Sequence, residues 1–388
     1  MPIKQKNLFF HGVSISISLF LVAFLIGFIE WGFSFSSFKF NDIIEEHELL
    51  NHRLIPNAEW NNNNISIIDP RYGKHTVRHN SQGWVEDYDV SQDKPSNTYR
   101  IFYVGDSFTA GTIVPKSQSV PDLVEKWLND NFKSQKYEVI NAGTSGYSTV
   151  IYNVLIRQFL HQYKPDLVVL NIDMTDNRED FKYKSTTTFD KNGIPIAVLP
   201  RSLSKEKYLD TEKGLVKNSW LKYLSVWLSK HSYTYNHFSY KKGIEKKLKE
   251  DYPPIWKDWT QHKWDTTIQK NVNFTLNQLT QIIEFCKSKN IELLVTSVPH
   301  YGQFSYGGET PKWSLRPHEI IKQRCAELGI SYFDSHEFLL PHLKNTEQPD
   351  YYFRKDMHFN DKGFALWAKA HQRALELLLK PENSKAFN

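Results

Sequence analysis

The chain of 388 residues, with a mass of 45.6 kDa, is long enough for one large domain with appendages. Hydrophobic residues make up 40% of it and aromatic residues 14%, which excludes a collagen-like, disordered or disulfide-scaffold protein. Its 48 Lys and Arg and 43 Asp and Glu give a formal net charge of +5 without a long basic run, so nucleic acid is not expected as a partner.

The first predicted element is an apolar helix from Leu8 to Ile29, in which His11 is the only titratable side chain. At about 1.5 Å per residue it would measure roughly 33 Å, close to the hydrocarbon thickness of a bilayer. A buried core helix would carry a polar stripe, and a cleaved signal peptide would have a shorter apolar region that ends at a small-x-small site. We therefore predict an uncleaved transmembrane anchor within residues 1–36.

Charged residues on either side of this helix predict its orientation. Lys4, Lys6 and the terminal amine precede it, whereas acidic residues such as Glu30 and Glu45 dominate the segment that follows. By the positive-inside rule, the N-terminus faces the cytoplasm and everything after about Phe35 lies in the periplasm or outside the cell. The sequence thus predicts a single-pass membrane protein whose substrate must be available on that side.

Residues 37–97 are polar and are predicted to form a stalk or lead-in, and residues 98–388 a catalytic domain. From residue 99 onward, short apolar runs alternate with amphipathic stretches, which is typical of a parallel sheet covered by helices. The predicted strands are 100–105, 137–142, 166–172, 291–298 and 330–334. The predicted helices are 119–132, 149–163, 267–288, 317–328 and 362–379. Five strands in this rhythm suffice for a doubly wound α/β sheet.

Residues 183–264 form too long a connection between the third and fourth strands and are predicted to be an insertion. The segment is rich in Lys and Tyr and is expected to fold over one rim of the sheet. It contains five of the eleven tryptophans, namely Trp220, Trp227, Trp256, Trp259 and Trp264. These rings are expected to form a small core of the insertion, and stacking on sugar rings is the alternative.

Two motifs at the edges of predicted elements carry candidate chemistry. The first strand ends in GDSF, which places the hydroxyl of Ser107 at the sheet edge where open parallel sheets bind ligands. A serine hydroxyl needs a base, and the best partner is His358 in the motif DMHFN before the last helix. Asp356 would accept a hydrogen bond from the other imidazole nitrogen and fix the tautomer. The alternative is that Ser107 only turns the chain and His358 only opens a helix.

The motifs GDSF at 105–108, NAG at 141–143 and DMHFNDKG at 356–363 resemble the first, second and fifth blocks of the SGNH, or GDSL, hydrolases. The lead-in at 78–108 is similar to that of membrane-anchored bacterial members, and the resemblance covers 99–181 and 270–379. It implies a flavodoxin-like three-layer α/β/α fold and ester or acyl-transfer chemistry by Ser107, His358 and Asp356. It also implies an oxyanion hole from the backbone N–H groups of Ser107 and Gly143 and an asparagine amide.

The third block departs from the family pattern, in which an Asn followed by Asp stands just beyond the third strand. Here the chain has Thr175 at the asparagine position, followed by Asp176, and Asn177 lies two residues further on. In a working enzyme either Thr175 or Asn177 is expected to supply the third oxyanion donor. The alternative is a slow or inactive enzyme, because the loss of such a donor elsewhere costs about 10²- to 10³-fold in turnover. His300, after the fourth strand, lies on the same rim but is expected to be incidental among the 15 histidines.

These features predict a membrane-anchored serine esterase that acts on ester-linked acyl groups, with an acylated glycan as the expected substrate. The alternatives are an O-acetyltransferase of the same fold, served by an integral membrane acyl donor, and a non-catalytic glycan-binding or assembly module. No metal or cofactor is expected, because Cys286 and Cys325 lack the spacing of a metal site. Whether these two cysteines form a disulfide stays open at this point.

Overall fold

The computed structural model describes residues 3–35, 43–62, 72–200, 209–210, 214–215, 224, 227–228, 231–249, 254–304, 310–343 and 348–380. The chain divides into two compact units, each described here by itself. The larger unit comprises 42–216 and 251–388, and the smaller comprises 1–41 and 217–250. The predicted insertion 183–264 therefore contributes to both units, and its Trp220 lies outside the described residues.

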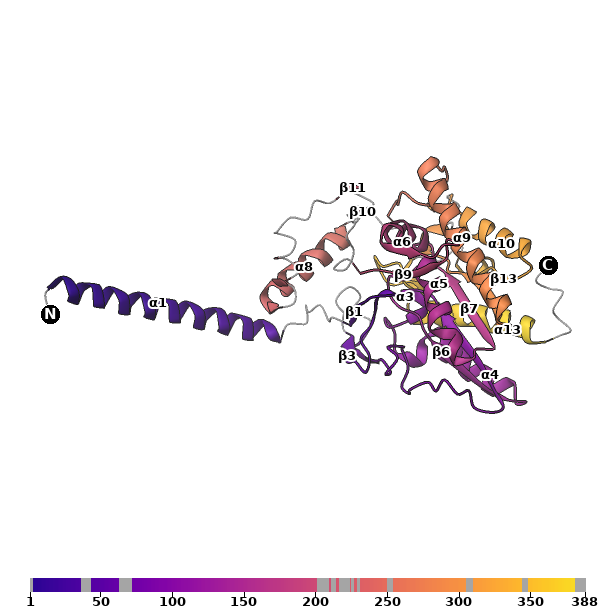
Figure 1. Cartoon of the computed structure of the whole chain (residues 1–388), viewed down its shortest axis with the longest axis horizontal. Coiled ribbons are helices and arrows are strands. Elements are labelled where there is room, and N and C mark those ends of the chain that lie inside the picture. The colour runs from indigo at the N-terminus through magenta and orange to yellow at the C-terminus, as the bar shows by residue number, and fades with distance from the viewer. Residues whose placement is uncertain are drawn as a thin grey trace. The chain divides into compact units, whose positions relative to one another are not determined.

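A parallel sheet of five strands forms the middle of the larger unit (Figure 1). Its strands are β5 (Thr98–Val104), β6 (Lys136–Asn141), β7 (Leu167–Ile172), β12 (Glu292–Ser297) and β13 (Ser331–Phe333). They are ordered β13-β12-β7-β5-β6, which is the flavodoxin-like order 2-1-3-4-5 when the five are numbered along the chain. The predicted fold class, a three-layer α/β/α domain on a five-stranded parallel sheet, is confirmed.

Helices cover both faces of this sheet, as its continuously apolar strands require. One hydrophobic cluster joins the sheet to the helices α5 (Thr149–Gln158), α9 (Thr266–Ser288) and α10 (Arg316–Glu327). A second cluster joins the other face to α4 (Val120–Asn131), α11 (Ser335–Leu343) and α13 (Asp361–Leu379). All six residues of β7 are buried between the two helical layers.

Side-chain caps explain where several of these helices begin. Asp265 accepts a hydrogen bond from the Ile268 N–H at 2.8 Å at the start of α9, and Asn360 accepts one from the Gly363 N–H at 3.0 Å at the start of α13. Each cap satisfies a backbone donor that has no intrahelical acceptor. The predicted helix 149–163 is shorter in the structure, because α5 ends at Gln158 and a 3₁₀ turn, Leu160–Tyr163, follows.

The remaining described elements are short. The helices are α3 (Ser107–Ala110), α6 (Asp176–Tyr183) and α12 (Gln348–Tyr351). Two-stranded pairs are formed by β1 (Ile44–His47) with β2 (Asn51–Leu54), β3 (Glu59–Asn62) with β4 (His75–Arg78), β8 (Thr187–Phe189) with β9 (Pro195–Val198), and β10 (Leu209–Asp210) with β11 (Gly214–Leu215). Leu50 and Trp84 of the predicted lead-in are buried in the sheet's first hydrophobic cluster. Cys286 and Cys325 are separate buried thiols, so the structure contains no disulfide between them.

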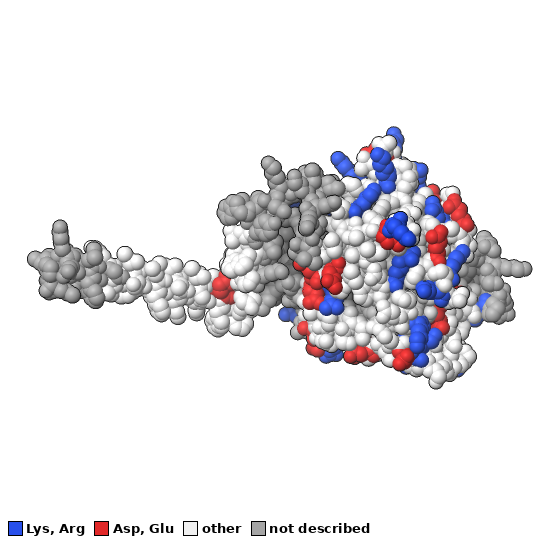
Figure 2. Space-filling view, viewed as in Figure 1, with Lys and Arg blue, Asp and Glu red and all other residues white. Residues whose placement is uncertain are grey.

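The smaller unit contains α1 (Ile3–Ser34) and α8 (Tyr233–Lys249). Within α1, the segment Val13–Ser34 is long and apolar enough to cross a membrane, and none of its most apolar window is buried inside the protein. The uncharged surface of the described part of this helix appears white in Figure 2. The apolar helix predicted at 8–29 is therefore present as a candidate membrane span.

Acid should destabilise the larger unit through His371, which is fully buried against Tyr103 and Trp367. Burial lowers the pKa of His371 to about 3, whereas an unfolded histidine has a pKa of about 6.5. The neutral ring therefore contributes stability above pH ~6.5 that is lost as the pH falls toward the folded value. At pH 5 this loss amounts to about 2 kcal/mol.

Denaturant unfolding of the detergent-solubilised full chain at pH 7 and pH 5 measures this loss. Between the two pH values, we expect the free energy of unfolding of His371→Phe to fall by about 2 kcal/mol less than that of the wild-type protein. His262→Phe, at an exposed histidine, is the matched control and should leave the pH dependence unchanged. Equal losses in the wild-type protein and His371→Phe would contradict the assignment.

Candidate active site

Ser107 is the first residue of α3, and Gly105 and Asp106 separate it from the end of the interior strand β5. Asp106 caps this short helix by accepting a hydrogen bond from the Phe108 N–H at 2.9 Å. The turn is tight at Gly105, where a Cβ atom would lie 2.0 Å from the Thr109 hydroxyl oxygen. A glycine is thus required before the Asp106-Ser107 pair, and the serine is presented at the carboxyl end of the sheet.

His358 and Asp356 lie in the turn that precedes α13. The turn is closed by hydrogen bonds from the Phe353 N–H to the His358 carbonyl at 3.0 Å and from the Asp356 N–H to the Phe353 carbonyl at 3.1 Å. Asn360, which caps α13, also donates its backbone N–H to the Tyr351 carbonyl at 3.0 Å. The histidine is therefore held by a structured turn on both sides.

The structure brings the three predicted residues into one chain of hydrogen bonds. The Ser107 hydroxyl donates to His358 Nε2 at 2.7 Å, and His358 Nδ1–H donates to Asp356 Oδ1 at 2.5 Å. The Asp356 carboxylate also accepts the His358 backbone N–H at 3.0 Å, which holds the two residues in register. The side chains of His358 and Asp356 remain 18% and 10% exposed, so a ligand can approach the histidine from solvent.

A second histidine and aspartate pair lies close to this chain of hydrogen bonds. His300 Nε2–H donates to Asp173 Oδ2 at 2.7 Å, and both side chains are buried. The Phe108 ring lies between the two histidines, with ring centroids 4.8 Å from His300 and 4.7 Å from His358. His300 is therefore a packed and paired residue beneath the site, whereas the sequence alone suggested an incidental one.

Three buried carboxyl groups, Asp106, Asp173 and Asp176, lie together behind Ser107. Burial raises the pKa of Asp106 well above its usual range, and the charge of Asp173 adds to this rise. Burial and the charge of Asp173 also raise the pKa of Asp176. For Asp173 burial acts in the same direction, but the charge and hydrogen bond of His300 outweigh it and lower the pKa. The arrangement thus favours one charged carboxylate beside two neutral acids.

The side chains predicted to supply the third oxyanion donor have other partners. The Thr175 hydroxyl donates to Asp173 Oδ1 at 2.6 Å, and the Thr175 backbone N–H donates to the same oxygen at 2.7 Å. The Asn177 amide donates to the Thr275 hydroxyl at 3.1 Å and accepts the Trp259 backbone N–H at 3.3 Å. The Thr175 hydroxyl would have to release Asp173 to serve as an oxyanion donor, whereas the Asn177 amide keeps a second N–H but is held at both its nitrogen and its oxygen.

The loop after β6 contributes the other predicted donor, Gly143. Its N–H donates to the Asn141 side chain at 3.1 Å, and a Cβ atom at this position would lie 2.4 Å from the Ala110 nitrogen. The next residue, Thr144, donates its N–H to the Gly105 carbonyl at 3.1 Å. This loop is thus pressed against the turn that carries the nucleophile. Within the described part of the chain, no group of three or more His, Cys, Asp or Glu is arranged to hold a metal ion.

No family model and no functionally curated protein matches the chain. Among solved structures, it is similar to a catalytic mutant of an acetylxylan esterase from Geobacillus stearothermophilus, with 11% identity, coverage of 71% of this chain and 94% of that one, and a TM-score of 0.42. It is also similar to a GDSL-like lipase from Bacteroides thetaiotaomicron, with 12% identity, coverage of 72% and 88%, and a TM-score of 0.35.

Replacement of Thr175 tests what its hydroxyl does. Because the hydroxyl is bonded to buried Asp173, we expect Thr175→Val to lower the free energy of unfolding by about 1–3 kcal/mol. Turnover by the folded protein should fall by less than the ~10² that removal of an oxyanion donor costs. Thr188→Val, in an exposed strand position, is the control. A 10²-fold loss of turnover with unchanged stability would instead assign Thr175 to the oxyanion hole.

Proposed function

We propose that the protein is a membrane-anchored serine esterase that acts on acyl esters outside the cytoplasm. The single observation that supports this most strongly is the continuous hydrogen-bond chain from Ser107 through His358 to Asp356, at 2.7 Å and 2.5 Å. A serine oxygen bonded to one imidazole nitrogen, with a carboxylate on the other, is the arrangement that activates a hydroxyl nucleophile.

In the proposed reaction, Ser107 Oγ attacks the acyl carbonyl as its proton passes to His358 Nε2. The carbon–oxygen bond to the leaving alcohol then breaks, and His358 returns the proton to that alcohol. Water, deprotonated by His358, releases the acyl group from Ser107 as a carboxylic acid. Asp356 keeps Nδ1 protonated and stabilises the imidazolium that forms in each half-reaction.

Backbone N–H groups at the nucleophile turn are the proposed donors to the oxyanion. The Ser107 N–H opens α3, where a helical N–H has no intrahelical acceptor. The Gly143 N–H would join it after exchanging its present acceptor, the Asn141 side chain.

The proposed substrates are ester-linked acyl groups on an exported glycan. The resemblance of three motifs to SGNH hydrolases favours acyl esters, and the anchor with its flanking charges favours substrates beyond the cytoplasmic side. Transfer to a sugar hydroxyl would use the same acyl-enzyme, with that hydroxyl in place of water. Product analysis with and without a polysaccharide acceptor distinguishes hydrolysis from transfer.

Trapping of Ser107 by a fluorophosphonate tests the proposed nucleophile. On the full chain in detergent, we expect covalent labelling of Ser107 in the wild-type protein and a loss of about 10³-fold or more in Ser107→Ala and His358→Ala, because triad residues act as a unit. Asp356→Asn should lose less of this labelling than His358→Ala.

Two matched variants control this experiment. Ser145→Ala and His262→Ala remove the same functional groups at partly or fully exposed positions outside the hydrogen-bond chain. Both should retain labelling. A wild-type protein that is folded but unlabelled, or a His358→Ala variant that labels normally, would remove the esterase proposal and favour a binding module.

The proposed topology places the larger unit on the non-cytoplasmic side. Because Lys4 and Lys6 precede the span and Glu30 lies near its end, protease added to the outside of intact spheroplasts should digest residues beyond about 35. An epitope at the N-terminus should be protected until the membrane is opened. Mature protein that begins after Phe35 would contradict the anchor.

A further inference from the structure

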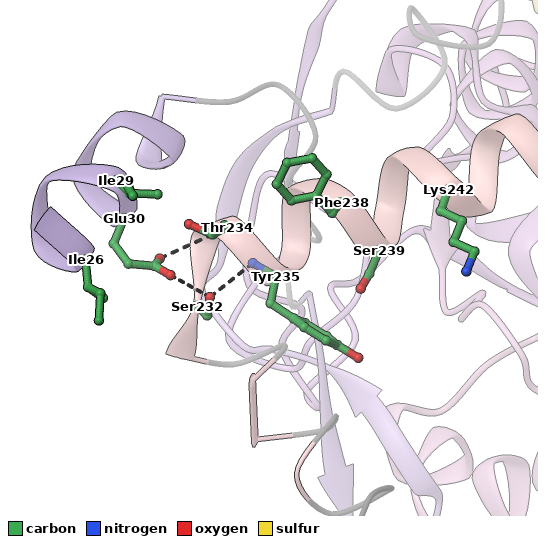
Figure 3. A pocket seen from close by; sticks show the side chains of 9 residues that line it. All are labelled: Ile26, Ile29, Glu30, Ser232, Thr234, Tyr235, Phe238, Ser239 and Lys242. Atoms are coloured by element: carbon green, nitrogen blue, oxygen red, sulfur yellow. Dashed lines mark hydrogen bonds between the residues drawn. The ribbon is translucent and has the colours of Figure 1, made fainter. Parts of the chain in front are cut away.

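Glu30, near the C-terminal end of α1, caps the helix α8 of the insertion (Figure 3). Its carboxylate accepts the Ser232 hydroxyl at 2.6 Å and the N–H groups of Tyr233 at 2.7 Å and Thr234 at 3.3 Å. A carboxylate at this end of a helix satisfies backbone donors and interacts favourably with the helix dipole. The first turn of α8 is therefore fixed beside the last turns of the candidate membrane span Val13–Ser34.

Further contacts show that α8 runs in the same direction as α1. Glu30 contacts residues 232–234, whereas the Phe33 ring lies 4.7 Å from His237 and 5.5 Å from Phe238. Later residues of α1 thus meet later residues of α8. If α1 spans a bilayer, the first turns of α8 lie at the level where the span ends and the later turns lead away from the membrane.

Large aromatic side chains are exposed on α1, on α8 and on the segment that precedes α8. On α1, Phe28 and Trp31 are 59% and 60% exposed, and on the insertion Trp227 and Phe238 are 55% and 57% exposed. Aromatic residues are enriched where a membrane protein meets the headgroup region, and exposed apolar groups at this density are unusual in water. Ile26, Ile29 and Phe238 also line an open groove of about 530 Å³ between the two helices (Figure 3).

Basic residues follow the aromatic ones along α8. Lys241, Lys242 and Lys249 are exposed, and Glu245 is the exposed acidic residue among them. Lysine side chains near an interface extend their ammonium groups toward lipid phosphates and are attracted to an anionic surface. Aromatic residues followed by lysines match the order of the layers that a chain crosses on leaving a bilayer.

We propose that Trp227 and the first half of α8, Tyr233 to Lys242, form a second membrane-contacting element. The aromatic side chains enter the headgroup region beside α1, and Lys241 and Lys242 bind the phosphates of anionic lipids. This inference rests on the proposed transmembrane role of α1 and is independent of the esterase chemistry. The element would prevent the chain from pivoting freely on a single helix where it leaves the bilayer.

Nitroxide labels on the full chain test this contact. The protein is reconstituted into vesicles of phosphatidylcholine and phosphatidylglycerol at a 7:3 ratio, with single labels at Phe238→Cys, at Val22→Cys in α1 and at exposed Lys191→Cys. The native thiols are buried, so the introduced cysteine is the accessible one. We expect the Phe238 label to collide preferentially with oxygen, as the Val22 label does, and the Lys191 label to collide with a water-soluble nickel complex.

The outcomes separate the two proposals. An oxygen-accessible Val22 label with a water-accessible Phe238 label would retain the anchor and overturn the α8 contact. Two water-accessible labels would overturn both. A Phe238 label that neither reagent reaches would indicate contact with a second copy of the chain, which also overturns the lipid contact. Fluorophosphonate labelling of the same samples reports separately on Ser107.

Two charge variants test the cap and the lysines. Glu30→Ala should shift the Phe238 label toward water, whereas Glu245→Ala, which removes a carboxylate from α8 itself, should not. Lys241→Glu with Lys242→Glu should remove the difference in label depth between anionic vesicles and vesicles of phosphatidylcholine alone. Because these lysines are exposed, this second variant remains informative if Glu30→Ala fails to fold. Unchanged depth in both variants would overturn the proposal.

Discussion

The hydrogen bond between Ser107 and His358 joins positions that lie 251 residues apart, and the proposed chemistry depends on it. Both residues are held by one aromatic cluster beneath them. Phe108, next to the serine, packs against Phe359, next to the histidine, at 5.5 Å, and against Trp367 of α13 at 6.3 Å. Hydrophobic packing is itself non-directional. Here, however, rigid aromatic rings fix the two backbone segments, and this holds Ser107 Oγ 2.7 Å from His358 Nε2.

The elements around the site could be predicted from local patterns, whereas its deeper layer could not. Apolar runs such as 166–172 and caps such as Asp265 predict strands and helix starts because their causes lie within a few residues. The pairing of His300 with Asp173 spans 127 residues and leaves no local signal. The sequence showed Thr175 at the asparagine position. It did not show that the Thr175 hydroxyl donates a hydrogen bond to Asp173, two residues earlier.

The buried acids give the nucleophile a defined electrostatic setting. Asp106 lies 3.3 Å from the Ser107 hydroxyl oxygen, so an ionised Asp106 would compete with His358 for the serine proton. Burial and the Asp173 charge, which raise the Asp106 pKa, reduce that competition. His300 in turn keeps Asp173 charged without an unpaired buried anion. His300 therefore influences the electrostatic environment of Ser107 through the carboxyl groups of Asp173 and Asp106, and not by direct contact.

Glu30 is the one acidic residue of the segment Val13–Ser34, which is otherwise without charge. Its hydrogen bonds to the insertion explain why a carboxylate is tolerated at this position. A carboxylate close to hydrocarbon is costly unless hydrogen bonds compensate for its lost hydration. The Ser232 hydroxyl and the first backbone N–H groups of α8 provide such bonds. Those N–H groups would themselves lack acceptors at a helix start. The helices α1 and α8 thus satisfy each other's polar groups, which explains how an acidic residue can lie in a segment that is apolar enough to cross a membrane.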